Sequence, residues 1–434
     1  MAANGHLIHY PVGKGSEQMS IDVCVVGGGM IVHDQILPSL YHLQRTGVVG
    51  WIDVVATSSA RIKDLLDTRF DRAFPGQTFQ PHPPAGADPN ERRPYLYKEV
   101  VAKLAPRNLV LVATPDPLHF EMVKFALEHD QHVLCVKPLV QTVKHAFEIE
   151  KLARERGLFV GVEYHKRFDR RALEAREHYR QGRFGQFRCG EAKMVEPYYY
   201  RHSNFQNWFT PENSDPFTYV GCHYVDQVYF ITGLRPVEVS VRGVKGRFPN
   251  GKETYMWSAG QVVFENGGIL SVIDGLGYPD DGAGTNDQGI TMFCDAGEDG
   301  AGPDRSAVIQ HNDQFRGVSH GYMDKISGAY FRYINPDYFR LVPWIGPGLK
   351  PVGYGYESIE ASVVTAAAMP KDIEAARAKL AETDQQGLIA TPGNSWINEL
   401  VTEAARKSIA EKGRAYSIRY EPEPRIEAAW QAVA

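Results

Sequence analysis

A chain of 434 residues exceeds the usual size of one domain and is long enough for two. Its net charge of -5 and its pI near 6.3 argue against a general affinity for nucleic acids or anionic membranes. The five cysteines form no C-x-x-C pair, so neither a structural zinc site nor a disulfide framework is expected. Residues 1–20 contain no apolar signal segment, and no later run approaches the ~18 apolar residues of a membrane span. We expect a soluble, cytoplasmic protein with no nucleic-acid or membrane partner.

An apolar run at residues 21–30, IDVCVVGGGM, contains three consecutive glycines. Its β-branched residues lack a polar face, which predicts a strand buried on both sides of a parallel sheet. Gly27, Gly28 and Gly29 let the backbone turn sharply and approach a ligand closely. A helix that starts here would direct its free N–H groups at the same point, which is how a pyrophosphate is bound. The third glycine of G-x-G-x-x-G is replaced by Val32, so the turn alone indicates a nucleotide site only weakly.

Strands and helices alternate as far as residue 165. This alternation predicts βαβ units and a mostly parallel sheet, whose ligands bind at the carboxyl ends of the strands. Residues 70–97, rich in Pro, Gly and charge, are expected to be a connection that carries little core. The expected strands are residues 51–57, 108–114, 132–136 and 158–164, and the expected helices are residues 35–46, 117–130 and 140–156.

The pattern changes from about residue 167. Several extended runs follow without long helices between them, and residues 265–268 carry a hairpin signal, which together predict a second, mainly antiparallel sheet. The runs are residues 187–195, 237–244, 261–264, 269–273 and 290–294. Helices are expected at residues 170–181, 219–232, 357–369 and 396–412, and an irregular stretch rich in aromatic residues and proline at residues 322–356.

The residues after the second strand favour NADP slightly over NAD. In such folds an Asp or Glu at this position accepts a hydrogen bond from the 2′-OH of the adenosine ribose. Residues 57–61 contain no acid, and Ser58 with Arg61 suits a 2′-phosphate instead. Arg61 could equally be the solvated start of a helix, and both interpretations stay open.

Four motifs, in this order, resemble those of the Gfo/Idh/MocA family of sugar and polyol oxidoreductases. They are VATPDPLH at residues 112–119, CVKP at residues 135–138, HKRFDR at residues 165–170 and YVGCHYVD at residues 219–226. The resemblance covers the chain from residue 21 to about residue 420.

The resemblance implies an α/β domain followed by an α+β domain. Residues 21–165 are expected to form a Rossmann dinucleotide-binding domain with a doubly wound parallel sheet. Residues 166–434 are expected to form a substrate-binding and oligomerisation domain with a large open, mainly antiparallel sheet. Residues 1–20 would be an N-terminal extension, and the helix at residues 396–412 could pack back near the first domain. Because the open sheet of this family commonly packs on another copy, a homodimer or homotetramer is expected.

The activity that the resemblance implies is hydride transfer between a nicotinamide, NAD or NADP, and a carbinol carbon of a sugar, sugar derivative or polyol. The hydride leaves only if the hydroxyl proton also leaves, so a base must lie within hydrogen-bond reach. A nearby cation stabilises the developing alkoxide. The family's Lys and His in these catalytic roles match Lys137 and His223.

Two positions depart from the family pattern. The Glu that precedes the family's Lys is Val136 here, and the Asp four residues before its His is Tyr219. Tyr219 could share proton transfer with His223 if Lys137 lowers the pKa of its phenol. It could equally stack on a sugar ring.

Further site residues follow from the motifs and from the strand ends that face the crevice. The expected cofactor-binding residues are Gly27, Gly28, Gly29, Met30, Ile31, Ser58, Arg61, Thr114, Pro115, His119 and Lys137. The expected substrate-binding residues are Lys137, Glu163, His165, Arg167, Tyr198, Tyr219 and His223. Arg167 could instead tie the two domains together, and Tyr198 could belong to the core. No metal is expected, because His165, Glu196, His202 and His223 lack the i, i+4 spacing of a helical metal site.

Two other functions stay open beside a plain dehydrogenase. Some members of this family keep the dinucleotide bound and carry out a redox-neutral epimerisation or glycoside cleavage. Another binds the dinucleotide as a sensor and regulates genes without turnover. Lys137 and His223 argue against the regulator, whereas Val32, Val136 and Tyr219 keep it open.

Overall fold

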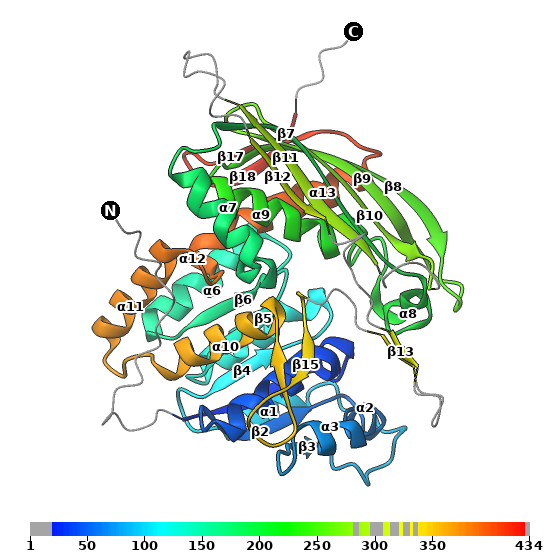
Figure 1. The fold of residues 1–434 in the computed structure, drawn as a ribbon, viewed down its shortest axis with the longest axis vertical. Helices are drawn as coiled ribbons and strands as arrows, with labels where there is room; N and C mark the ends of the chain where they lie inside the picture. The colour runs from blue at the N-terminus through cyan, green and yellow to red at the C-terminus, as the bar shows by residue number, and fades with distance from the viewer. Residues whose placement is uncertain are drawn as a thin grey trace.

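The computed structural model of the chain describes residues 20–280, 286–295, 307–312, 321–323, 330–332 and 337–429. Apart from Ser20, the expected N-terminal extension therefore lies outside the described residues. Two large sheets, of six and eight strands, organise the described chain, and helices pack on both (Figure 1). No helix among these residues is both long and apolar enough to cross a membrane.

The six-stranded sheet is parallel throughout, in the order β3-β2-β1-β4-β5-β6. Val25 on the central strand pairs with Val54 on one side and Leu111 on the other, and all three side chains are buried. The predicted parallel sheet of buried strands is thus confirmed. The strands are β1 (Ile21–Val26), β2 (Val49–Val55), β3 (Gln80–His82), β4 (Leu109–Val112), β5 (His132–Val136) and β6 (Val160–Glu163).

Helices cover both faces of this parallel sheet. Val23 and Val25 of β1 pack in one cluster with α1, α10 and α11, whereas Cys24 and Val26 pack in another with α5 and α6. The helix expected at residues 357–369 is therefore present as α10. The helices of this domain are α1 (Leu37–Arg45), α2 (Ser59–Leu65), α3 (Thr68–Ala73), α4 (Leu96–Val101), α5 (His119–Glu128), α6 (Val143–Arg156), α10 (Tyr354–Ala367), α11 (Ile373–Gln386) and α12 (Pro392–Ser395).

The expectation that residues 70–97 carry little core is wrong. This connection contains β3, which extends the parallel sheet beside β2, and it buries Phe74 and Phe79 in the core. Leu96 in α4 is buried in the cluster on the other face. Pro81 fits β3 because an edge strand leaves one side of its backbone unpaired.

The eight-stranded sheet has the order β12-β11-β7-β10-β9-β8-β17-β18. Strands β7 and β10 run parallel and the other described pairs run antiparallel, which confirms a mainly antiparallel sheet. The predicted hairpin at residues 265–268 joins β9 to β10. The strands are β7 (Gln186–Pro197), β8 (Pro236–Arg247), β9 (Glu253–Phe264), β10 (Ile269–Tyr278), β11 (Asp287–Asp295), β12 (Ala307–Asn312), β17 (Tyr416–Arg419) and β18 (Arg425–Ala428).

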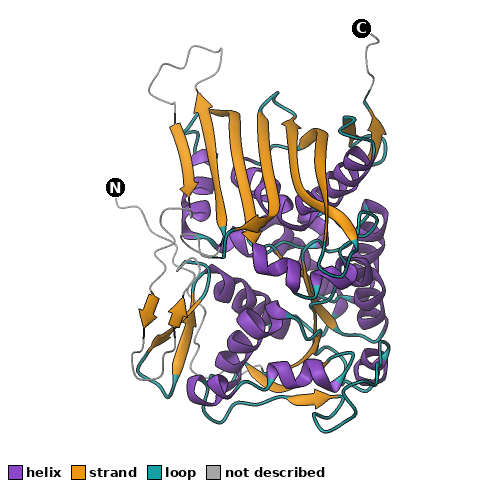
Figure 2. Ribbon diagram, turned by 90° about the vertical axis from the view of Figure 1, so that its right-hand side faces the viewer, coloured by secondary structure: helices purple, strands orange, loops and turns teal. Residues whose placement is uncertain are grey.

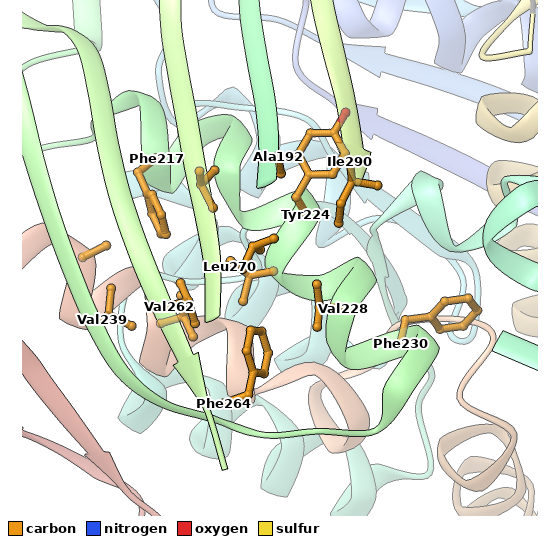
Figure 3. Close-up of a cluster of buried hydrophobic side chains, with 14 of the residues drawn as sticks. Ala192, Phe217, Tyr224, Val228, Phe230, Val239, Val262, Phe264, Leu270 and Ile290 are labelled. Atoms are coloured by element: carbon orange, nitrogen blue, oxygen red, sulfur yellow. The ribbon is translucent and has the colours of Figure 1, made fainter. Parts of the chain in front are cut away.

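Helices pack on one face of this second sheet (Figure 2). Inward-facing Leu270 and Val262 lie in one buried cluster with Val228 of α9 (Figure 3). Helix α13 packs on β8 and also on α6 of the first domain. Glu399 of α13 accepts a hydrogen bond from the backbone N–H of Leu139, which precedes α6 in the chain. The helices are α7 (Arg170–Arg180), α8 (Phe205–Trp208), α9 (Cys222–Thr232) and α13 (Ile397–Ala410).

Two short hairpins lie in the stretch expected to be irregular, of which residues 324–329 and 333–336 fall outside the described residues. One pairs β13 (Gly321–Met323) with β14 (Tyr330–Arg332), and the other pairs β15 (Arg340–Pro343) with β16 (Leu349–Val352). Arg45 of α1 donates to the carbonyl groups of Pro347 and Leu349. These bonds fix the second hairpin on the parallel domain, close to the segment that carries Tyr338.

Candidate active site

A cavity of about 260 Å³ lies where the carboxyl ends of β1, β4, β5 and β6 meet the second sheet and its helices. Many of the predicted site residues line it, as the placement of strand ends in a parallel sheet requires. The predicted residues that line it are Gly29, Met30, Ile31, Thr114, Pro115, Lys137, Glu163, His165, Tyr219 and His223. Residues from the second domain that share the lining include Glu196, Tyr200, Asn204, Phe205 and Trp208.

The glycine turn after β1 combines close backbone packing at Gly27 with open space at Gly29. A Cβ atom on Gly27 would lie 2.1 Å from the carbonyl oxygen of Ala113, and the φ of Gly27 is +142°, so only glycine fits. At Gly29 a Cβ atom would meet nothing within 4 Å, so the backbone faces open space. The helical segment begins at Met30, and its first N–H groups have no partners within the helix.

A core residue occupies the position of the third glycine. Val32 is fully buried in the core of the parallel domain. The chain forms a π-helical turn over Val32–Ile36, which is wider than an α-helix, before α1 begins. The turn therefore keeps Gly29, which lines the cavity, and departs from the motif at Val32, on the core side.

Lys137 projects from the end of β5 into the cavity. Its Nζ donates to the backbone carbonyl of Tyr219 and lies 4.0 Å from the centroid of the Tyr219 ring. These contacts join the first domain to the wide helical turn Phe217–Gly221 that precedes α9. The Lys137 ammonium thus lies at the boundary between the two domains.

His223 is the second residue of α9 and is buried, with 2% of its surface exposed. Its Nδ1 has no hydrogen-bond partner among the described residues. Burial lowers the pKa of His223 well below its usual value, and the nearby side chains of His165 and Lys137 act in the same direction. The imidazole is therefore neutral at neutral pH and can accept a proton.

A second histidine lies against His223. The ring centroids of His165 and His223 are 4.6 Å apart. Nδ1 of His165 lies 2.8 Å from Oε2 of Glu163, whose Oε1 accepts from Gln35 at 2.9 Å. The phenol of Tyr338 in turn donates to Gln35. The pair Glu163 and His165 is thus held in place from the first domain.

Of the two roles left open for Tyr219, proton transfer required Lys137 to lower the pKa of its phenol, and the structure does not support that condition. Burial raises the pKa of the Tyr219 phenol, and the negative charges of Asp116 and Glu196 raise it further. Lys137 lies over the face of the ring and bonds to the backbone. The phenol therefore stays protonated at neutral pH.

Several predicted site residues do not line the cavity. His119 is fully buried, and its ring nitrogens lie 2.8 Å from the carbonyl oxygens of Pro138 and Thr114, so it braces the ends of β4 and β5. Tyr198 is 45% exposed. Ser58 is buried, with 1% of its surface exposed. Arg61 lies beside the glycine turn: a Cβ atom built on Gly28 would be 3.2 Å from the Cβ atom of Arg61.

Arg167 holds the domains together instead of facing the cavity. Its guanidinium forms two hydrogen bonds with Asp226 of α9, at 2.8 and 2.5 Å, and a third with Asn394 at 3.0 Å. Arg167 and Asp226 are 2% and 1% exposed. Of the two interpretations of Arg167, the contacts match the structural tie.

We expect Arg167→Met to lower the free energy of unfolding by roughly 3–5 kcal/mol, because it leaves the Asp226 carboxylate buried without its cation. Urea unfolding followed by circular dichroism measures the change. Arg170→Met is the control, since Arg170 is 88% exposed in its pair with Glu357 and its loss should leave stability unchanged. Equal stability of the two variants would contradict the structural role.

Sequence reasoning missed several residues that shape the cavity. Asp116 follows the Thr-Pro pair, is 3% exposed and accepts a hydrogen bond from Ser214 at 2.9 Å. Glu196, considered from the sequence only as a metal ligand, is the next-to-last residue of β7 and is 5% exposed. The alternation of inward side chains along β7, with Ala192 and Met194 buried, was a signal for Glu196. No local pattern indicated Tyr338, which reaches the cavity from a segment far along the chain.

The described residues contain no group of three or more His, Cys, Asp or Glu side chains that could hold a metal ion.

Two protein-family models match the chain. A model of the oxidoreductase family with an NAD-binding Rossmann fold matches residues 21–164, and a GFO/IDH/MocA C-terminal domain model matches residues 172–297. Together the two matches span more than half of the chain. The chain belongs to the Gfo/Idh/MocA family.

Named relatives of this Gfo/Idh/MocA protein match only in part. An uncharacterised oxidoreductase of Schizosaccharomyces pombe is 31% identical over 32% of this chain and 38% of its own length. The D-glucoside 3-dehydrogenase of Escherichia coli is 26% identical over 38% of this chain and 50% of its own length. The chain thus spans half or less of the length of these relatives.

Solved structures share the fold over most of the chain. The crystal structure of GenD2 from gentamicin A biosynthesis, in complex with NAD, has a TM-score of 0.64 and 17% identity. The match covers 94% of this chain and 99% of that one. At this identity the likeness establishes the two-domain fold.

Proposed function

We propose that the protein is an NAD(P)-dependent oxidoreductase that transfers a hydride between the nicotinamide and a carbinol carbon of a sugar, sugar derivative or polyol. The observation that carries the proposal is one cavity that the glycine turn, Lys137 and His223 line together. Membership of the Gfo/Idh/MocA family supports it, and so does similarity to a D-glucoside 3-dehydrogenase.

The residues present fit a dinucleotide. Gly27 could not carry a side chain, and Gly29 leaves the space beside the helix start open, so backbone N–H groups can approach a pyrophosphate. Met30, Ile31, Thr114 and Pro115 continue this lining into the cavity, where the nicotinamide half would lie. When bound, the nicotinamide accepts or supplies the hydride.

His223 is the proposed base in the oxidation direction. Its imidazole is kept neutral by burial, and its Nδ1 has no partner among the described residues. It takes the hydroxyl proton, while the Lys137 ammonium stabilises the developing alkoxide. In the reduction direction His223 returns the proton. Glu163 holds the ring of His165 against His223 and acts as a positioning residue.

Arg61 is the proposed contact for the 2′-phosphate of NADP. Its guanidinium lies 3.2 Å from Oδ1 of Asn204 and is 38% exposed, beside the glycine turn. We expect Arg61→Ala to weaken NADPH binding about 10-fold or more while NADH binding changes little, because only NADPH carries the extra phosphate. Titrations followed by nicotinamide fluorescence measure both. Exposed Lys63→Ala is the control, and equal weakening of both nucleotides by Arg61→Ala would contradict the role.

The proposed activity is tested by incubating the purified protein with NAD⁺ or NADP⁺ and with methyl β-D-glucoside, D-xylose or myo-inositol. We expect one pair to produce reduced nicotinamide, seen by its absorbance. Consumption of a sugar without net reduced nicotinamide would favour the redox-neutral alternative. Absence of binding of both nucleotides would rule out the proposed function.

A further inference from the structure

The cavity is lined by more acidic than basic side chains. Of the described residues that line it, Asp116, Glu163 and Glu196 are acidic, and Lys137 alone carries a lysine or arginine side chain. Lys137 already bonds to a backbone carbonyl. A substrate that carries a carboxylate or phosphate would therefore enter surroundings with three acidic side chains and one lysine.

Glu196 differs from the other two acids in its partners. Glu163 accepts from His165, Gln35 and Ser358, whereas the described hydrogen-bonding neighbour of Glu196 is the neutral amide of Asn286.

No ion pair joins Glu196 to another described residue. Lys137 and Lys166 lie near enough to lower the pKa of Glu196, but their Nζ atoms bond to the Tyr219 carbonyl and to Gln288. Burial has the larger, opposite effect and raises that pKa. A carboxyl group that is 5% exposed and lacks a direct cation is costly to ionise.

Aromatic rings line the same cavity as Glu196, among them those of Tyr200, Phe205 and Tyr219. The negative charge of Glu196 contributes to the raised pKa of Tyr199, Tyr200 and Tyr219, where burial is the main cause. The ring of Phe205 stacks on Tyr200 at 5.3 Å and meets Tyr219 edge-on at 4.9 Å. Aromatic faces attract cations and also pack on the C–H faces of sugar rings.

We propose that the substrate carries an amine, as in an amino sugar or an aminocyclitol, and that its ammonium group binds between Glu196 and the rings of Tyr200 and Phe205. An ammonium supplies the missing partner of the buried carboxylate and meets the aromatic faces at the same time. The carbinol carbon then faces Lys137 and His223 across the cavity. This substrate class deepens the proposed function and rests on it.

Binding to the protein saturated with NADH or NADPH tests the proposal without turnover. Calorimetry compares two matched pairs, D-glucosamine with D-glucose and D-galactosamine with D-galactose. We expect at least one amine to bind about 10- to 100-fold more tightly than its neutral partner, and D-glucuronate not to bind. Glu196→Gln should remove this preference, because the amide keeps the shape and loses the charge. Glu191→Gln, on the exposed face of the same strand, should retain it.

Neutral sugars that bind as tightly as their amines in both pairs, or no binding of either amine, would overturn the proposal. Equal weakening of amine and neutral sugar in Glu196→Gln would overturn it too, and would indicate a role for Glu196 in the general architecture of the site. Failure of the proposed function can be told apart from failure of this proposal. It would appear as absence of saturable NADH or NADPH binding, before any sugar is added.

Discussion

Replacing Lys137 with methionine should lower kcat by about 10²- to 10⁴-fold, because the alkoxide then develops without its cation. Methionine is unbranched and only one heavy atom shorter than lysine, so the change removes mainly the charge and the bond to the Tyr219 carbonyl. Dinucleotide binding should persist, since the glycine turn lies on a different strand end. Steady-state kinetics on a substrate found with the wild-type protein measure the loss.

The matched control is Lys144→Met, which alters an exposed lysine seven positions further along the chain, in α6. It should leave both turnover and nucleotide binding intact. A Lys137→Met enzyme with wild-type kcat would show that no cation is needed at this position, and Lys137 would then be a structural contact between the domains.

His223→Gln should lower kcat by a comparable factor of about 10²–10⁴, because glutamine cannot accept the hydroxyl proton. The wild-type pH profile provides a second readout. Since burial lowers the pKa of His223 well below the usual 6.5, the neutral base is already present at pH values below 6.5. Oxidation should therefore not lose rate through protonation of His223 as the pH falls from about 8 to about 6.

His202→Gln is the control for His223, because His202 is exposed and does not line the cavity. If His223→Gln kept both the wild-type rate and the wild-type pH profile, the base would have to be another group. An acid limb centred near pH 6.5 in the wild-type protein would likewise contradict a buried, neutral His223.

The parallel sheet could be predicted because its strands are short, apolar and buried. Strand β5 begins and ends where the apolar run does, and Gly157 ends α6 in the left-handed conformation that glycine favours. Strand β3 could not be predicted, because Pro81 and the surrounding turn residues give no strand pattern in the sequence. Where α10 and α11 pack depends on contacts between distant parts of the chain, which local patterns do not contain.

The candidate site also contains residues that the sequence predicts and residues that it does not. Lys137 and the glycine turn were identified because each follows a recognisable strand and belongs to a motif. Glu196 belongs to no motif, and only its inward position on β7 distinguishes it from the exposed acids of the chain. The pKa of Tyr219 depends on burial and on the charges of Asp116 and Glu196, so it could not be read from the spacing between Tyr219 and His223.

The most direct test of the proposed hydride transfer is an isotope measurement. The protein is incubated with NAD⁺ or NADP⁺ and with a substrate that is deuterated at its carbinol carbons. The nicotinamide nucleotide is then recovered, and its mass is measured by mass spectrometry. We predict one deuterium atom in the reduced nicotinamide formed by the wild-type protein, and formation of the same labelled product about 10²- to 10⁴-fold more slowly with Lys137→Met. Product formed by the wild-type protein while the nicotinamide stays oxidised and unlabelled would contradict a net hydride transfer to the dinucleotide.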